Sequence, residues 1–252
     1  MLTATEWAEY AQKYDTTVGN LLPYQDMLAQ IQHALPQLSC DARIVDLGCG
    51  TGNLSQLLTQ AGYTVTGIDG IQQMIERAAA KCAATFLDPH NLNNGIPCPN
   101  ASEDAAVSCN VLYALKDPAA HIAEVARIIK PGSTFVCSTP GPNFQKGLIL
   151  KAHAEACGMT VNQPDAFWLN IDGHIDREDA CAAAAVSDPD MRDDMQWLTR
   201  FNARIVQSAD YHFLSEAELR ALFSDPIWQS VQIEATYAAQ NWLVTATKGG
   251  SS

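Results

Sequence analysis

Long apolar runs and positive charge are both scarce in this chain of 252 residues. No hydrophobic stretch reaches the roughly 20 residues that a membrane-spanning helix needs, so we expect no membrane partner. The chain has 15 Lys and Arg against 28 Asp and Glu, which gives a formal net charge of −13. An acidic surface repels phosphate backbones, and we therefore expect no nucleic-acid partner either.

Two further absences concern cysteine spacing and the start of the chain. The eight cysteines never occur as C-x-x-C, so we expect reduced thiols and no structural zinc. The opening residues, MLTATEWAEYAQKYD, contain acids and aromatic residues but no basic segment followed by an apolar core. They do not have the pattern of a secretory signal, and we expect a cytoplasmic protein.

The most informative stretch runs from Ile44 to Leu54 and reads IVDLGCGTGNL. Its first residues are apolar and suit a buried parallel strand, and glycines follow at positions 48, 50 and 52. A helix is predicted next, over Asn53 to Ala61. A strand that passes through a glycine-rich bend into a helix presents backbone amides and a helix N-terminus to a ligand.

The glycine spacing and a nearby acid narrow the class of ligand. The next predicted strand, Thr64–Ile68, ends at Asp69, where a nucleotide-like ligand places its ribose hydroxyls. The dinucleotide fingerprint G-x-G-x-x-G is not present, because the third glycine comes one place early, and the loop lacks the P-loop lysine. The spacing therefore disfavours a pyrophosphate or triphosphate ligand.

The stretch that begins at Asp46 fits D-x-G-x-G-x-G and resembles motif I of the class I S-adenosylmethionine-dependent methyltransferases. Two later segments resemble the same family. Residues 103–115 resemble motif II, with Glu103 in place of the usual Phe, and residues 130–133 (KPGS) resemble the K-P-G-G turn before strand five, with Ser133 in place of the second glycine. The resemblance covers residues 40–140.

The resemblance implies an α/β fold with a Rossmann-like, seven-stranded mixed sheet and helices on both faces. Helical periodicity in residues 5–16 and 21–35 predicts an N-terminal helical cap within residues 1–36. The S-adenosylmethionine-binding core is expected in residues 37–140 and a helical insertion or lid in 141–212. Residues 213–248 are expected to supply the last helix, capped by Ser215 and Glu218, and a closing β-hairpin.

The resemblance also assigns a site for S-adenosylmethionine. It implies that Asp69 meets the ribose, that Asp88 accepts a hydrogen bond from the adenine amino group, and that Tyr14 approaches the methionine carboxylate. The alternative for Tyr14 is simple docking of the cap helix. The predicted cofactor-binding residues are Tyr14, Asp46, Gly48, Cys49, Gly50, Gly52, Asn53, Asp69, Gly70, Ile71, Met74, Asp88, Pro89, Asn110 and Val111.

Three residues are candidates for the chemistry at the acceptor. His90 and His174 are possible bases because a free imidazole titrates near neutrality, and Tyr113 is a possible orienting group. A loop histidine and a core tyrosine are the structural alternatives. The DGHID run around His174 holds one histidine and two acids, too weak a set to predict a metal. His121 and Glu124 are expected to face solvent or to cap a neighbouring segment.

The implied reaction moves a methyl group to an O, N or C nucleophile of a small-molecule acceptor, carried out by a monomer or homodimer. Nine acids lie between Asp165 and Asp194, and they either attract a cationic or amine acceptor or form a solvated surface. Three alternatives stay open: a protein or peptide methyltransferase, a non-catalytic cofactor-binding activator subunit, and aminopropyl transfer from decarboxylated adenosylmethionine.

Overall fold

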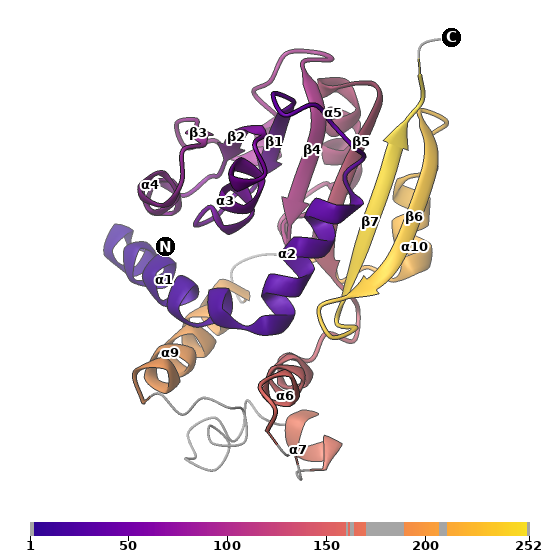
Figure 1. Ribbon diagram of the computed structural model, residues 1–252. Helices are drawn as coiled ribbons and strands as arrows, with labels where there is room; N and C mark the ends of the chain where they lie inside the picture. The colour runs from indigo at the N-terminus through magenta and orange to yellow at the C-terminus, as the bar shows by residue number, and fades with distance from the viewer. Residues whose placement is uncertain (1–2, 160, 162–163, 170–188, 207–210, 251–252) are drawn as a thin grey trace.

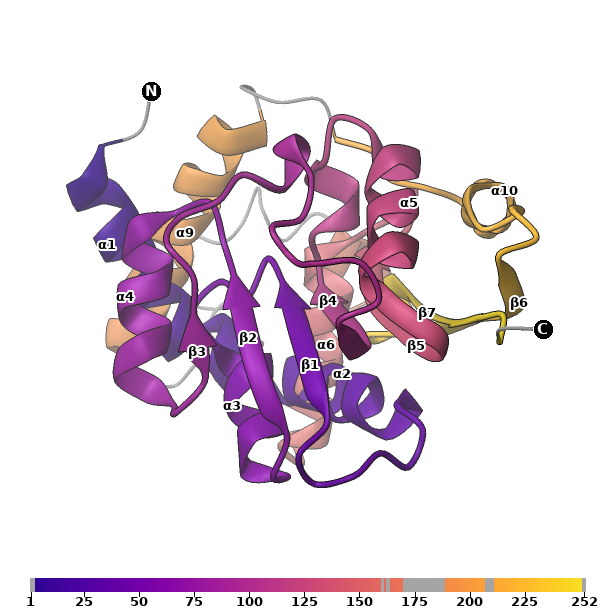
Figure 2. The same ribbon diagram turned by 90° about the horizontal axis from the view of Figure 1, so that it is seen from above.

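The computed structural model describes residues 3–159, 161, 164–169, 189–206 and 211–250 (Figures 1 and 2). Its centre is a seven-stranded sheet in the order β3-β2-β1-β4-β5-β7-β6. The first five strands pair in parallel, and β7 pairs antiparallel with both β5 and β6. The predicted mixed sheet and closing hairpin are confirmed. The strands are β1 (Arg43–Leu47), β2 (Thr64–Ile68), β3 (Thr85–Phe86), β4 (Glu103–Cys109), β5 (Ile129–Pro140), β6 (Trp228–Thr236) and β7 (Asn241–Lys248).

Helices cover both faces of this sheet and bury two apolar layers. One layer joins α2, α3 and α6 to the face that carries Ile44 and Val107, and the other joins α5 and α10 to the face that carries Val45 and Phe135. Alternate residues of a strand point to opposite faces, which is why neighbours such as Ile44 and Val45 enter different layers. The helices are α1 (Ala4–Thr16), α2 (Leu22–Ala34), α3 (Asn53–Gln60), α4 (Gln72–Lys81), α5 (Pro118–Ile128), α6 (Lys146–Ala156), α7 (Asp165–Leu169), α9 (Pro189–Val206) and α10 (Glu216–Leu222).

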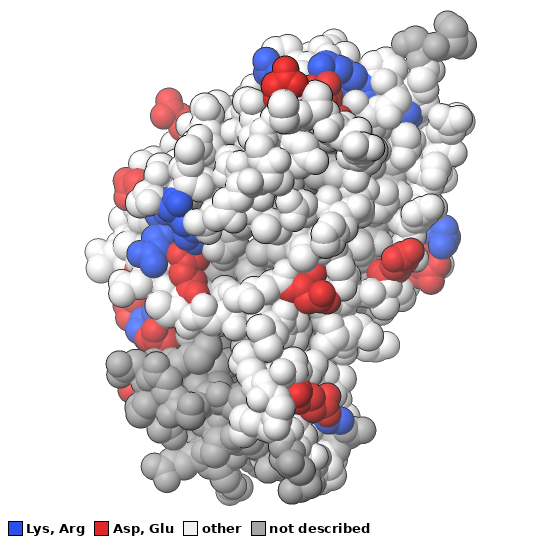
Figure 3. Space-filling model, viewed as in Figure 1, with Lys and Arg blue, Asp and Glu red and all other residues white. Residues whose placement is uncertain are grey.

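The cap helix α1 lies beyond the sheet, where it contacts α4 and α9 (Figure 1). Aromatic rings join it to α9, since Phe201 packs 5.5 Å from Trp7 and 4.9 Å from Tyr10 between ring centroids. A described part of the predicted insertion therefore meets the predicted cap. Figure 3 shows Lys, Arg, Asp and Glu in small separate groups on the molecule's visible face, with uncharged residues over most of the area between them.

Two predictions about the region around strand five are wrong. The KPGS turn lies inside β5, because the strand already pairs at Ile129 with Glu103 and resumes pairing at Thr134 with Ala105. Residues 130–133 therefore oppose a single residue of β4 and form a bulge. His121 is 5% exposed and does not face solvent, whereas Glu124 caps a neighbouring segment by accepting the backbone N–H of Ile96.

No helix in the described ranges is both long and apolar enough to cross a membrane.

Candidate functional site

The glycine loop between β1 and α3 is fixed against the end of β2. The backbone N–H groups of Gly48 and Cys49 both donate to the carbonyl of Ile68, at 2.7 and 3.0 Å. Gly50 has a φ of +52°, which favours glycine, and a Cβ atom placed there would meet nothing within 4 Å. The loop thus holds its backbone open on one side, as a ligand cradle requires.

Asp69, the first residue after β2, is bonded directly to this loop. Its Oδ2 accepts the N–H of Gly50 at 2.9 Å, and its Oδ1 accepts the N–H of Ile71 at the start of α4, also at 2.9 Å. Burial raises the pKa of Asp69, and these backbone hydrogen bonds oppose that effect. The structure therefore brings together the loop and the acid that the sequence analysis paired.

Asp46 lies underneath the glycine loop rather than on its open side. Its carboxylate is 1% exposed, Oδ2 accepts the Ser55 hydroxyl of α3 at 2.6 Å, and Oδ1 has no described partner. Burial raises the pKa of Asp46 to about 7. In the structure this carboxyl braces the loop against α3.

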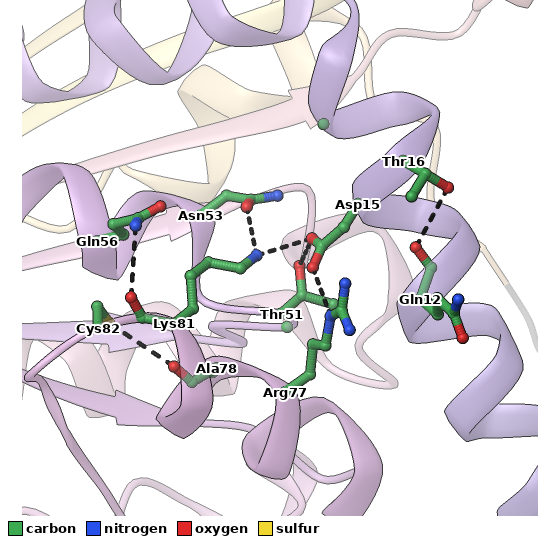
Figure 4. A network of polar contacts seen from close by, with 12 residues as sticks. Gln12, Asp15, Thr16, Thr51, Asn53, Gln56, Arg77, Ala78, Lys81 and Cys82 are labelled. Carbon is green, nitrogen blue, oxygen red and sulfur yellow. Dashed lines mark hydrogen bonds and ion pairs between the residues drawn. The ribbon is translucent and has the colours of Figure 1, made fainter. Parts of the chain in front are cut away.

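A charged network links the cap helix α1 to the glycine loop (Figure 4). Asp15 of α1 accepts a hydrogen bond from Thr51 of the loop at 2.6 Å, and it pairs with Arg77 and Lys81 of α4, each at 2.8 Å. Lys81 also reaches Oδ1 of Asn53 at 2.7 Å. Burial opposes ionisation of Asp15, but hydrogen bonds from Lys81, Thr51 and Arg77 outweigh it and lower its pKa. Asp15, Arg77 and Lys81 are not among the site residues predicted from the sequence.

At the end of β4, Asn110 and Val111 close the other side of the loop. A Cβ atom on Gly48 would lie 2.2 Å from Cγ2 of Val111, so the two segments are in direct contact. Asn110 has a φ of +58°, and its Oδ1 accepts the Nδ2–H of Asn241 at 2.6 Å. Asn241 begins β7 and is 2% exposed, so the closing hairpin holds this predicted site residue in place.

Tyrosines surround the end of β4. Tyr14 lies 6.0 Å from both Tyr10 and Tyr24 between ring centroids, and Tyr24 lies 6.3 Å from Tyr237 of the β6–β7 turn. Tyr113 stacks on Tyr211 at 5.1 Å. Tyr113 and Tyr211 also raise the pKa of Tyr10, so the two groups of rings lie near each other. We call this set the tyrosine cluster: Tyr10, Tyr14, Tyr24, Tyr113, Tyr211 and Tyr237.

The predicted residues that follow β3 lie at the same edge of the sheet as Asp69. The backbone N–H of His90 donates to the carbonyl of Asp69 at 2.9 Å, and its Nε2 lies 2.9 Å from the carbonyl oxygen of Gly95. Asp88 and Pro89, just before it, are exposed. His174 lies outside the described residues, as does the whole DGHID run. Within the described ranges, no group of three or more His, Cys, Asp or Glu is placed to hold a metal ion.

Comparisons with known proteins find methyltransferases. The chain is 28% identical over 196 residues to the malonyl-[acyl-carrier protein] O-methyltransferase of Hahella chejuensis, covering 73% of this chain and 62% of that one. It is 32% identical over 117 residues to the ubiquinone biosynthesis O-methyltransferase of Aromatoleum aromaticum, covering 45% and 50%. The chain thus spans less than two thirds of the length of these curated relatives.

Solved structures show the same fold. An S-adenosylmethionine-dependent methyltransferase from Mesorhizobium loti superposes with a TM-score of 0.53 at 22% identity, covering 87% of this chain and 96% of that one. One from Aquifex aeolicus superposes with a TM-score of 0.54 at 12% identity, covering 98% and 100%. The family described as "Methyltransferase domain" matches residues 22–225. Because that match includes the glycine loop, Asp69 and the end of β4, the chain belongs to the methyltransferase domain family.

Proposed function

We propose that this chain binds S-adenosylmethionine at the glycine loop and catalyses transfer of its methyl group to a small-molecule acceptor. The bond between Gly50 and Asp69 carries the proposal, because it sets an open stretch of backbone beside a carboxylate. Both lie at the carboxyl ends of β1 and β2, the edge at which open α/β sheets bind nucleotide-like ligands.

The residues at this edge fit the cofactor. Gly50 leaves room where any other residue would place a Cβ atom, and Asp69 keeps lone pairs that two ribose hydroxyls can share. Asp88 is exposed at the end of β3, where it is available to an adenine amino group. Tyr14 lies on the cap side, toward the methionine end in the proposed pose. Met74 and Ile71 would flank the adenosine from the start of α4.

The cofactor supplies a methyl group on a positively charged sulfur, which is already activated toward a nucleophile. The chain's own residues have to bind and orient the cofactor and the acceptor and to exclude water from the site. These effects align the two reactants. Val111 contacts Gly48, and in the proposed pose Asn110 and Val111 lie between the glycine loop and the tyrosine cluster. Asp15, by joining α1 to Thr51 of the loop, would keep the cap closed over the site.

A small-molecule acceptor is favoured by the tyrosine cluster, whose rings crowd the end of β4 from several elements. An open surface groove, which a peptide acceptor needs, does not fit rings that lie 5.1–6.3 Å apart. The names of both curated relatives given above specify O-methyl transfer, which favours an oxygen nucleophile. We further propose that α9, through its Phe201, covers the acceptor side. His90 and His174 stay candidate bases.

Calorimetric titration with S-adenosylmethionine and S-adenosylhomocysteine tests the proposal. We expect the wild type to bind both and Asp69→Ala to bind about 10- to 100-fold more weakly, as loss of hydrogen bonds to a charged group predicts. Asp26→Ala, an exposed acid of α2, is the matched control and should bind as the wild type does. Absence of binding by the wild type, or equal binding by the Asp69→Ala variant, would refute the proposed site.

A further inference from the structure

The carboxyl end of β4 and the turn of the closing hairpin share an uncommon backbone conformation. Five residues other than glycine have a positive φ in the described ranges, and four of them are Asn110 and the turn residues Tyr237, Ala238 and Ala239. A residue with a Cβ atom is strained in this left-handed region, although Asn tolerates it better than most. Such strain persists only where the surrounding structure imposes it, and it is concentrated at functional sites.

Three hydrogen bonds impose this conformation on Asn110. Its backbone N–H donates to the carbonyl of Ser138 in β5 at 3.0 Å. Its Oδ1 accepts the Nδ2–H of Asn241 at 2.6 Å and, over a longer distance of 3.4 Å, the hydroxyl of Ser138. Asn241 stands 131 residues later in the chain. The shortest of the three bonds therefore comes from the last strand of the sheet.

The fold gains little stability from Asn241 itself. The residue is 2% exposed, and its Oδ1 has no described partner. Its Nδ2 also lies 3.6 Å from the sulfur of Met27, which is a weak acceptor. A buried amide with one unsatisfied end costs stability relative to an apolar side chain of the same shape. Stability alone would therefore favour a residue such as Leu at this position.

The residue that follows Asn110 rests on the glycine loop. A Cβ atom on Gly48 would lie 2.2–3.2 Å from three atoms of the Val111 side chain, so Val111 packs directly on the bare backbone of Gly48. Two residues further along the loop, Gly50 donates its N–H to Asp69. The φ angle of Asn110 sets the direction in which the chain continues to Val111. A different φ at that residue would take Val111 away from the loop.

We propose that Asn241 is a positioning residue for the cofactor, which it serves by holding Asn110 in the left-handed conformation that keeps Val111 against the glycine loop. The inference rests on the proposed function, in which the ligand of this loop is S-adenosylmethionine. Asn241 acts through Asn110 and does not have to touch the cofactor. The closing hairpin thereby takes part in binding a ligand that lies at the ends of β1 and β2.

Stability and affinity should respond differently to Asn241→Leu. The substitution nearly keeps the volume of the side chain and removes the unsatisfied Oδ1, so the melting temperature should stay the same or rise. It also removes the bond to Asn110. S-adenosylmethionine and S-adenosylhomocysteine should then bind about 3- to 10-fold more weakly, which is the loss expected for one hydrogen bond between neutral groups. A purely structural residue would show the reverse, a loss of stability with unchanged affinity.

Calorimetric titration with both ligands, together with thermal melts, tests the inference on three variants. Asn241→Asp keeps a polar partner for the Asn110 amide in either protonation state, so it should bind both ligands within about twofold of the wild type. Thr236→Val is the matched control. Thr236 pairs directly with Asn241 across the hairpin, is equally buried, and has a hydroxyl without a described partner. Its substitution should leave the affinity unchanged, whereas Asn241→Leu should lower it.

A double-mutant cycle shows whether the effect passes through Asn110. Asn110→Gly removes the side chain that Asn241 holds, while glycine adopts the same φ unaided, so binding stays measurable. Adding Asn241→Leu to Asn110→Gly should therefore cost no further affinity. If Asn241→Leu does not fold, the cycle is run with Asn241→Ser, whose shorter side chain cannot reach Oδ1 of Asn110.

Three results would overturn the inference: wild-type affinity in Asn241→Leu, an equal loss of affinity in Thr236→Val, or the same loss from the substitution at Asn241 with and without Asn110→Gly. Weak binding by Asn241→Asp, equal to that of Asn241→Leu, would also overturn it. Absence of binding of both ligands by the wild type would instead refute the proposed function.

Discussion

Thr51 of the glycine loop donates a hydrogen bond to Oδ1 of Asp15, 2.6 Å away in the cap helix. Lys81 donates to the same oxygen and Arg77 to the other, so one carboxylate of α1 binds groups from both the glycine loop and α4 (Figure 4). The glycine loop and the cap helix are therefore linked, and a substitution at Asp15 should affect both.

We predict that Asp15→Ala lowers the free energy of unfolding by about 1–2 kcal/mol, because two cations and Thr51 lose their partner. The expected loss is small because the Arg77 side chain is 42% exposed, and solvent weakens its ion pair with Asp15. The variant should also bind S-adenosylmethionine more weakly. Urea denaturation and calorimetry measure the two effects, with Glu9→Ala, an exposed acid of the same helix, as the control. Unchanged stability and binding would show that the network does not hold the cap.

Gly50→Ala should abolish or strongly weaken cofactor binding. A left-handed backbone costs a residue with a Cβ atom about 1–2 kcal/mol, and the new methyl group would enter the space left open for the ligand. Gly132→Ala is a matched control: Gly132 has a φ of +82° and equally open surroundings, but it lies in the bulge of β5. Both variants should lose similar stability in thermal melts, while only Gly50→Ala loses binding. Equal binding by the two would contradict a ligand cradle at Gly50.

Asp46 should make the protein less stable as the pH rises from about 4 to 7. Its pKa is raised from 3.8 to about 7, so the folded state holds the proton more tightly than the unfolded state over that range. The stabilisation is complete below pH 4 and lost as the pH rises through 7, and the difference is at most about 4 kcal/mol. Asp46→Asn should remove this slope in urea denaturation at pH 5 and pH 8, while Asp26→Asn should keep it.

His121 should have the opposite effect. It is buried, its Nδ1 has no described partner, and burial lowers its pKa from 6.5 to about 4. The unfolded state therefore binds the proton more readily, and stability falls as the pH drops from 6.5 to 4, by at most about 3 kcal/mol. We predict that His121→Leu reduces this acid-side loss in urea denaturation at pH 4.5 and 7, whereas His33→Gln, an exposed histidine, does not. An unchanged pH profile for His121→Leu would contradict a buried neutral imidazole.

The parts of the fold that local pattern could predict are the glycine loop, the strand ends and the alternation of helices with strands. Gly50 and Asp69 were paired correctly because each is fixed by a strand terminus, and parallel strands end at one edge. The polarity of His121 predicts a solvent-facing side chain, but its position in α5, four residues before the buried Val125, places it on the buried face of the helix. The KPGS bulge was missed because a glycine and a proline predict a turn whether or not the strand continues beyond it.

The tyrosine cluster and the Asp15 network could not be predicted from the sequence. Tyr237 was only one position of a β-rich run, and nothing local shows that its turn meets Tyr24 of the second helix. In the same way, Asp15 and Lys81 become neighbours only when α1 folds across α4. Contacts between distant segments depend on tertiary packing, which periodicity and motif spacing do not record.

The contact between Tyr24 and Tyr237 has a consequence for the synthesis of the protein on the ribosome. The segments from β1 to β4, which carry most of the proposed cofactor site, are synthesised first, but Asn110 gains its partner Asn241, and Tyr24 its neighbour Tyr237, only when the last strand pair folds. A chain still attached to the ribosome would thus carry the glycine loop before these parts of the proposed site were held in place. Activity would begin only once the final hairpin emerged and folded back, so synthesis itself would time the start of catalysis.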